Sequence, residues 1–178
     1  MKPWLRLSAL LQYPDEELYG AADELPRWMR ETPLRELQAA YVQTFDFDRR
    51  ASLHLTYHTH GDRRQRGLEL VRLKRRFADA GLPLTGSELP DYLPVLLEFA
   101  ALAPADGEAV LNELRVPLEL VRARLHATES PYAELLDALV AALPKRTRAQ
   151  AEAAQRLAEE GPPAELVGLE PFAAEAPA

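Results

Sequence analysis

Cysteine is absent from this sequence of 178 residues. Its absence excludes a disulfide framework, a thiolate nucleophile, and any zinc or iron–sulfur site with cysteine ligands. Aromatic residues are few, at 7 %, and the hydrophobic 47 % consists mostly of leucine and alanine, which lose little entropy in a helix. The composition therefore favours helices over sheets.

Long apolar segments are missing as well. No run approaches the roughly 18 apolar residues that a membrane span requires. Arg6, Ser8 and Gln12 interrupt the first apolar stretch, which therefore does not resemble a secretory signal peptide. We expect a cytoplasmic protein with no direct membrane insertion.

The length fits a single domain, which would bury roughly 70 % of the surface of its unfolded chain. The sequence shows no internal repeat, no glycine-rich phosphate loop and no long linker. We predict one all-α domain over residues 1–161, a helical bundle of about seven or eight helices. Residues 162–178 contain four prolines and three glutamates, which predicts a flexible acidic tail.

Capping residues and prolines predict where the helices begin and end. Asp15, Thr32 and Asp62 are placed to cap three helices, and Asp106 opens a long one that Pro117 is expected to bend. The expected helices cover residues 4–11, 16–25, 34–45, 63–80, 89–102, 107–127, 131–143 and 147–160.

Residues 46–61 follow a different pattern, because Leu53, Leu55 and Tyr57 alternate with polar residues. A period of two is typical of a strand. No other segment offers a partner strand, however, and an isolated strand cannot satisfy its backbone groups. We therefore expect either an ordered connector or a helix that overrides the pattern.

The formal net charge of −7 argues against general nucleic-acid binding, which depends on clustered Lys and Arg. The charge is uneven. Residues 61–80 carry seven basic residues against three acidic ones, and residues 151–178 carry six glutamates against one arginine. Either region could steer an oppositely charged partner or be a solvated surface.

The basic residues cluster in the expected helix 63–80, whose Leu68, Val71 and Phe77 are expected to face inward. The opposite face could bind a nucleotide, a nucleic acid or an acidic peptide, or could simply be solvated. Its basic residues are Arg63, Arg64, Arg66, Arg72, Lys74, Arg75 and Arg76.

Three histidines close together raise the hypothesis of a metal-dependent helical enzyme. The histidines and the nearby aspartates are His54, His58, His60, Asp46, Asp48 and Asp62. No His-Glu-x-x-His pattern is present, and no nucleophile elbow surrounds Ser52 or Thr56. The alternative is that these histidines form local hydrogen bonds.

Five segments carry a more specific signal. They are residues 10–14 (LLQYP), 41–50 (YVQTFDFDRR), 53–57 (LHLTY), 61–67 (GDRRQRG) and 88–99 (ELPDYLPVLLEF). In order and spacing they resemble the NarJ-type nitrate reductase delta subunit family, part of the TorD, DmsD and NarJ superfamily of redox enzyme maturation proteins. The resemblance covers roughly the first hundred residues. Residues 168–172 (GLEPF) resemble a shortened form of the family's acidic, proline-containing end.

The resemblance implies a maturation chaperone and not an enzyme. Such a protein binds the N-terminal segment of the apo catalytic (alpha) subunit of a respiratory nitrate reductase or a related molybdoenzyme. It delays membrane docking and keeps the subunit competent to receive a molybdenum bis-guanine-dinucleotide cofactor. The chaperone holds no permanent cofactor of its own, and cofactor-delivery proteins are further candidate partners.

A groove between helices could bind such a client peptide through apolar anchors, with charges around its rim. The predicted apolar surface comprises Tyr41, Phe45, Phe47, Leu55 and Tyr57, with Tyr92 close by. The predicted directional contacts are Asp46, Asp48, Arg49 and Arg50, with Asp91 close by, and the predicted electrostatic rim is Arg63, Arg64 and Arg66. The alternative is that the aromatic residues belong to the core and that the aspartates cap helices or pair with arginines.

Overall fold

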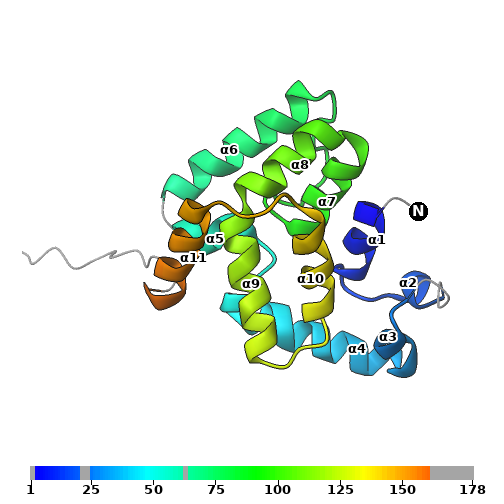
Figure 1. Ribbon diagram of the computed structural model, residues 1–178. Coiled ribbons are helices and arrows are strands. Elements are labelled where there is room, and N and C mark those ends of the chain that lie inside the picture. Colours follow the sequence, from blue (N-terminus) through cyan, green and yellow to red (C-terminus); the bar gives the residue numbers. More distant parts are fainter. Residues whose placement is uncertain (1–2, 21–24, 62–63, 161–178) are drawn as a thin grey trace, which may run out of the picture.

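The computed structural model describes residues 3–20, 25–61 and 64–160 of an all-α protein (Figure 1). Eleven α-helices lie in these ranges, eight of them with eight residues or more, which confirms the predicted helical bundle. None of these helices is long and apolar enough to cross a membrane. The α-helices are α1 (Pro3–Leu10), α2 (Glu16–Gly20), α3 (Arg27–Glu31), α4 (Leu34–Tyr41), α5 (Leu55–His60), α6 (Arg64–Asp79), α7 (Leu93–Leu102), α8 (Pro104–Glu113), α9 (Arg115–Ala127), α10 (Ala133–Ala142) and α11 (Arg148–Glu160).

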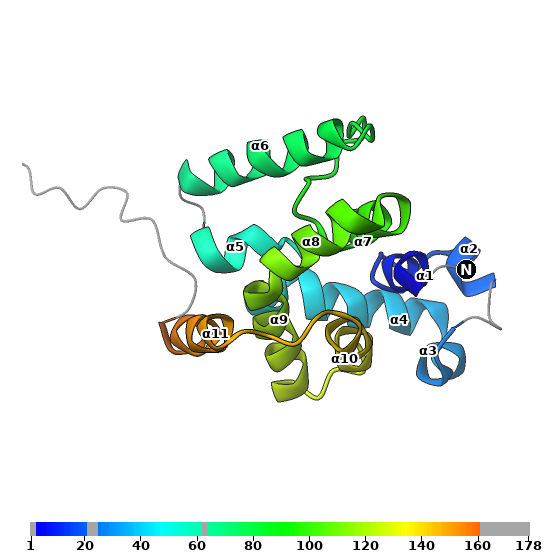
Figure 2. The ribbon, with the colours of Figure 1, turned by 45° about the horizontal axis from the view of Figure 1, so that its top comes forward.

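Helix α7 lies at the centre of the core because it is apolar around most of its circumference. Its buried residues are Leu93, Pro94, Leu96, Leu97, Phe99, Ala100 and Ala101. Helices α1 and α8 pack against it, and the three lie next to one another in Figures 1 and 2. Helix α8 comes so close at Gly107 that a Cβ atom there would lie 2.3 Å from Cα of Ala100.

Capping confirms two of the predicted helix starts. A carboxylate oxygen of Asp15 accepts a hydrogen bond from the backbone N–H of Leu18 at 2.8 Å, in the first turn of α2. Thr147 and Gln150 exchange hydrogen bonds of 2.8 and 3.2 Å at the start of α11, as in a capping box. The predicted cap Asp62 and the tail at residues 162–178 lie outside the described residues.

The predicted cap Thr32 has another role, so that prediction was wrong. Its hydroxyl donates to the backbone carbonyl of Trp28 at 2.7 Å, inside the unexpected short helix α3. Pro33 occupies the N-cap position of α4, with no side-chain hydrogen bond there. Thr32 lies just after the last residue of α3, where its hydroxyl can reach a free carbonyl of the final turn, so the threonine closes α3 and does not open α4.

Two helices replace the single bent helix predicted for residues 107–127. Helix α8 begins at Pro104, two residues before Asp106, and ends at Glu113, while α9 begins at Arg115. Pro117 lies four residues after Glu113. Its ring displaces that carbonyl from helical bonding, and it has no N–H to donate. The proline therefore separates two helices, and the prediction of one bent helix was wrong.

The segment with alternating apolar residues forms a short backbone bridge followed by helix α5. The N–H of Leu55 donates to the carbonyl of Asp91 at 3.0 Å, and that of Leu93 donates to the carbonyl of Leu53 at 2.9 Å. This extended pairing also explains why α7 begins at Leu93 and not at the predicted Leu89. The sequence had left both a connector and a helix open, and the structure contains both.

Helix α6 lies on the outside of the molecule (Figure 2). Leu73 and Phe77 face inward, and the ring of Phe77 stacks on that of Phe99 with centroids 4.1 Å apart. Leu68 and Val71 are both 67 % exposed, so the expectation that they face the core was wrong. Among the described residues, one side of this helix meets the rest of the protein, and these two residues lie on the other side.

Candidate functional site

The buried carboxylate of Asp91 joins segments that are distant in the sequence. Its side chain is fully buried. One oxygen lies 3.3 Å from Nδ1 of His54, and the other accepts hydrogen bonds from the backbone N–H and hydroxyl of Thr56. The second oxygen also accepts from Nη2 of Arg66 at 3.3 Å. The carboxylate thereby holds the beginning of α6 against α5 and the start of α7.

Opposing effects act on the pKa of Asp91. Burial alone raises the pKa, but hydrogen bonds from His54 and Thr56, together with the positive charge of Arg66, outweigh it. The pKa therefore lies below its ordinary value of 3.8. The ionised carboxylate is a structural anchor.

Tyr41 and Tyr92 connect three of the five segments that carry the family resemblance. The Tyr41 hydroxyl donates to the backbone carbonyl of Leu11 at 3.1 Å and lies 3.1 Å from the Tyr92 hydroxyl, which must then be the donor to it. Burial raises the pKa of both tyrosines. These contacts bring residues 10–14, 41–50 and 88–99 together in space.

The predicted apolar groove residues divide between core and surface. Tyr41, Phe45 and Leu55 have exposed fractions of 5, 7 and 0 %, so they lie in the core, as the alternative reading of the sequence allowed. Tyr57 and Tyr92 are half-buried. These five residues do not form an open apolar groove in the described part of the molecule.

Phe47 and the charged residues around it are accessible. They lie at the end of the π-helical turn η2 (Val42–Asp46), in the 3₁₀ turn η3 (Arg49–Ala51) and between the two turns. Phe47 is 75 % exposed. Asp48 caps η3 and also contacts α9, where its carboxylate lies 2.6 Å from Nε of Arg124. The other exposed residues of this stretch are Asp46, Arg49 and Arg50.

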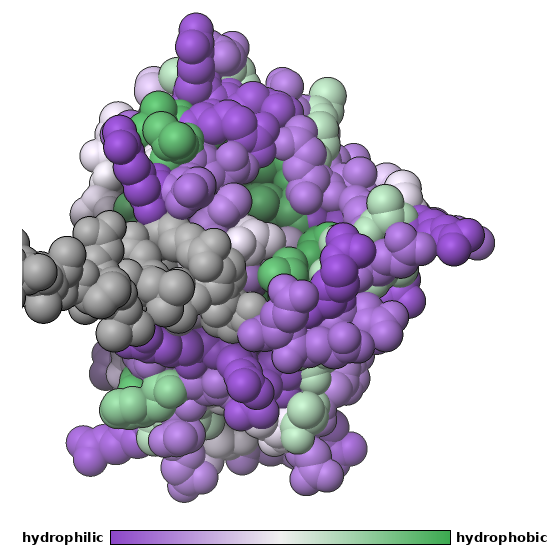
Figure 3. Space-filling model, turned by 90° about the vertical axis from the view of Figure 1, so that its left-hand side faces the viewer, coloured by the Kyte–Doolittle hydropathy of each residue, from purple (hydrophilic) through white to green (hydrophobic). Residues whose placement is uncertain are grey.

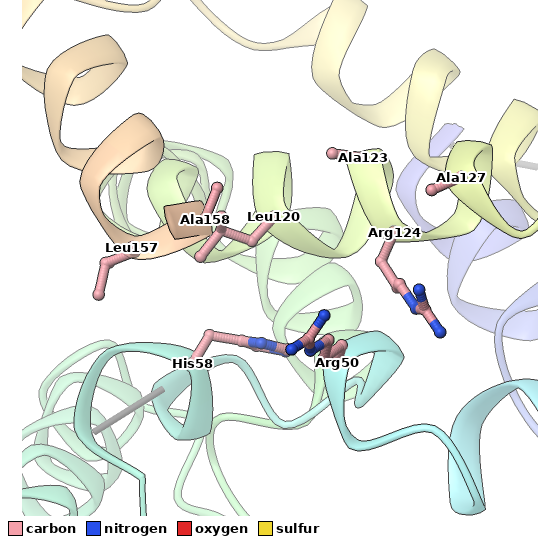
Figure 4. Close-up of a pocket in the computed structure, with 8 residues that line it drawn as sticks. All are labelled: Arg50, His58, Leu120, Ala123, Arg124, Ala127, Leu157 and Ala158. Atoms are coloured by element: carbon pink, nitrogen blue, oxygen red, sulfur yellow. The ribbon is translucent and has the colours of Figure 1, made fainter. Parts of the chain in front are cut away.

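Two pockets lie on either side of Arg124, and together they are called the α9 site. The first has a volume of about 240 Å³. Figure 4 shows α9 facing the segment of η3 and α5 across this pocket, with α11 at one end. Its lining residues are Arg50, His58, Leu120, Ala123, Arg124, Ala127, Leu157 and Ala158.

The second pocket has a volume of about 580 Å³ and lies between the end of α4, η2 and the turn after α9. Phe47, Asp48 and Arg124 line it together with Ser130. The hydroxyl of Ser130 is buried and has no hydrogen-bond partner among the described residues. The preceding Glu129 has a φ of +53°, a left-handed conformation that is uncommon for a residue other than glycine.

His58 is buried beside the first pocket, where its Nε2 donates to the backbone carbonyl of Ser52 at 2.8 Å. Burial lowers its pKa below the ordinary value of 6.5, although the hydrogen bond to Ser52 and the negative charges of Asp91 and Asp48 oppose this effect. The folded protein therefore disfavours protonation of this ring relative to the unfolded chain.

Because the unfolded chain binds this proton more readily, we expect stability to fall as the pH drops below 6.5. Urea unfolding between about pH 7.5 and about pH 5.5 measures this dependence. His58→Gln should show a smaller decrease over that interval than the unmodified chain. An identical decrease would show that other groups cause it.

The histidines do not converge on a common site. His54 contacts Asp91, His58 contacts a backbone carbonyl, and no group of three or more potential metal ligands occurs in the described parts of the chain. The structure gives the metal-enzyme hypothesis no support.

The basic residues of α6 have different environments. Arg66 faces inward to Asp91, while Arg72 and Arg76 pair with Glu113 of α8 at 3.0 and 3.2 Å. Arg64, Lys74 and Arg75 are exposed, and Arg63 lies outside the described residues. The described basic residues of α6 therefore do not form one continuous face that could bind phosphate groups.

Sequence reasoning missed the second wall of the α9 site. Leu120, Ala123, Arg124 and Ala127 lie on one face of α9, and Leu157 of α11 completes the wall. Their spacing of three and four residues was a readable signal for a common face. The resemblance ended before this region, so nothing distinguished that face from an ordinary core face.

Comparisons with known proteins agree with the sequence resemblance. The family model described as nitrate reductase delta subunit matches residues 12–138. A Bacillus subtilis protein named probable nitrate reductase molybdenum cofactor assembly chaperone NarJ is 38 % identical over 160 residues, covering 77 % of this chain and 85 % of that protein. The Escherichia coli K12 chaperone NarJ is 37 % identical over 158 residues, covering 75 % of this chain and 66 % of its own length. The nitrate reductase-like protein NarX of Mycobacterium tuberculosis H37Rv is 35 % identical over 153 residues. This match covers 76 % of this chain but only 23 % of NarX.

Proposed function

Because the chain belongs to the nitrate reductase delta subunit family, we propose that it is a maturation chaperone for the catalytic subunit of a respiratory nitrate reductase. It binds the N-terminal segment of the apo subunit in the cytoplasm. It keeps the subunit competent for insertion of the molybdenum bis-guanine-dinucleotide cofactor and for assembly at the membrane. The chain acts by binding, without catalysis and without a permanent cofactor. The names of the relatives, which are assembly chaperones for this cofactor, support this role.

The exposure of Phe47 next to the α9 site is the observation that carries the choice of binding surface. A phenylalanine that is 75 % exposed gains little from its position in the isolated protein. It gains about 1.5–3 kcal/mol when a partner buries it. Phe47 also lines the second pocket, so a peptide seated there would contact it directly.

The remaining side chains of the site suggest how an amphipathic peptide is oriented. Leu120 and Leu157 provide apolar walls in the first pocket, and Arg50 and Arg124 provide positive charge. Asp48 and Arg124 provide one charge of each sign in the second pocket. Apolar anchors give such a complex its affinity, while charged groups set its orientation and association rate.

The buried signature residues have a supporting role in this proposal. The hydrogen bonds of Asp91 and the hydroxyl pair of Tyr41 and Tyr92 hold the neighbouring segments in place. Phe45 and Leu55 fill the core beneath the turn that presents Phe47. The peptide itself contacts the exposed residues Phe47, Arg49 and Arg50, and it approaches Asp46 and Asp48.

Phe47→Ala is expected to weaken binding of a synthetic peptide, with the sequence of the catalytic subunit's N-terminal segment, by about 10-fold to 100-fold. Isothermal titration calorimetry measures the affinity. The melting temperature should be unchanged, because an exposed side chain contributes little to the core.

Leu102→Ala is the matched control, since Leu102 is 63 % exposed at the end of α7 and lies outside the α9 site. It should leave the affinity unchanged. Equal affinities for the Phe47 variant and the unmodified chain would remove Phe47 from the binding surface. Failure of the unmodified chain to bind the peptide would remove the proposed function.

A further inference from the structure

Within the described part of the chain, helix α6 contacts the other helices along one side. Leu73 and Phe77 are buried against the core. Arg72 and Arg76 pair with Glu113 of α8 at 3.0 and 3.2 Å. These contacts fix the helix and leave its opposite face uncovered.

The uncovered face is apolar at its middle and basic at both ends. Leu68 and Val71 are each 67 % exposed and lie one helical turn apart. Arg64 precedes them, Lys74 and Arg75 follow, and all three cations are exposed without an ion pair among the described residues. Figure 3 shows hydrophobic residues surrounded by hydrophilic ones in the upper part of the molecule, where α6 lies in Figure 1. This combination of exposed leucine, valine and unpaired cations is typical of an interaction surface.

The chain itself contains a segment with complementary chemistry. Residues 165–175 (ELVGLEPFAAE) carry three glutamates and no basic residue. Between these glutamates stand Leu166, Val167, Leu169 and Phe172. The three negative charges of this segment complement the three positive charges of the α6 face, and its apolar residues complement the exposed pair Leu68 and Val71.

The segment can reach α6. The described chain ends at Glu160, the last residue of α11, and α11 lies at the same side of the molecule as α5 and the beginning of α6 in Figures 1 and 2. Leu169 is the ninth residue after Glu160, and nine residues span up to about 30 Å when extended. Helix α6 itself, with 16 residues, is about 24 Å long.

We propose that residues 165–175 dock on the exposed face of α6 in the same chain, with Leu169 and its neighbours covering Leu68 and Val71. A tether of this length gives an effective concentration in the millimolar range, which favours this contact over the same contact with a second copy. Docking also restrains α11, whose Leu157 forms part of the α9 site.

The absence of native cysteine allows a direct test by disulfide trapping in the full chain. The variant V71C/L169C places one thiol on α6 and one in the segment. The control L102C/L169C uses Leu102 of α7, which is 63 % exposed against 67 % for Val71. Oxidation under mild conditions, followed by intact mass measurement and non-reducing electrophoresis, reports the rate of intramolecular disulfide formation.

We expect V71C/L169C to close at least about tenfold faster than L102C/L169C. Adding E165Q, E170Q and E175Q should slow closure several-fold, and so should higher salt, because both weaken the charge pairing. Equal rates at the two positions, or no effect of the three glutamine substitutions, would overturn the proposal. Preferential formation of disulfide-linked dimers would also overturn it and would assign the α6 face to a second copy. The rate of disulfide formation does not depend on binding of the client peptide. This experiment can therefore fail or succeed independently of the proposed function.

Discussion

Asp91→Ala is expected to lower the free energy of unfolding by about 3 kcal/mol or more, because it removes the common partner of several donors in the interior. The variant leaves the hydroxyl of Thr56 and Nη2 of Arg66 without their acceptor. Arg66 is only 20 % exposed, so water replaces the lost partner poorly. Urea unfolding at neutral pH measures the loss, and Asp91→Asn, which keeps one acceptor oxygen, should lose less.

Asp137→Ala is the control for this prediction. Asp137 also contacts two basic side chains, Arg122 and His126, but its own side chain is 39 % exposed. Ion pairs at such accessible positions contribute about 0–1 kcal/mol. If the two variants lost equal stability, the hydrogen bonds around Asp91 would not anchor α6 as described.

The pH dependence of the same carboxylate has a defined sign. The pKa of Asp91 is lower in the folded protein than its ordinary value of 3.8. Its contribution to stability is therefore fully present above pH 3.8 and is lost as the pH falls through the folded-state pKa. The stability difference between the unmodified chain and Asp91→Asn should therefore shrink as the pH falls below 3.8, because only the unmodified chain has this contribution to lose.

Gly107→Ala is expected to be the second strongly destabilising change, by about 3 kcal/mol or more. A Cβ atom at this position would lie 2.3 Å from Cα and 2.5 Å from N of Ala100, and 2.8 Å from the carbonyl carbon of Phe99. These are backbone atoms of the central helix α7, which cannot move as the end of a flexible side chain could. The substitution must therefore push α8 away from α7. Thermal and urea unfolding measure the effect.

Gly67→Ala is the control, and it is expected to raise the stability of the protein. Gly67 lies inside α6, and a Cβ atom there would meet nothing within 4 Å. Alanine in a helix is more favourable than glycine by about 0.5–1 kcal/mol, so this variant should gain stability of that order. A comparable loss in both variants would contradict the close approach of α8 to α7.

Local signals predicted most of the helices. Asp15 caps α2 as the sequence indicates, because a cap depends only on residues within one turn. Helix α11 also begins close to the expected residue, where Thr147 accepts a hydrogen bond from the N–H of Gln150. The errors occurred where one helix influences another. Thr32 bonds to α3 instead of opening α4, and Pro117 separates α8 from α9 where only a bend was expected.

Three of the residues that the sequence singled out lie at the pockets of the proposed site. Phe47, Asp48 and Arg50 were chosen from residues 41–50, and all three line the pockets of the α9 site. Arg124 was not foreseen. It follows Asp48 by 76 residues, and sequence spacing carries no information about a contact between segments so far apart.

The sequence by itself determined the all-α class, most helix positions and the family, because composition, capping and the five signature segments are properties of neighbouring residues. Only the tertiary structure decided which signature residues are buried and which are exposed. Phe45 and Phe47 carry the same side chain two residues apart, yet the first is 7 % exposed and the second is 75 % exposed. Burial depends on what the rest of the chain packs against each face, and that is decided by contacts between distant helices.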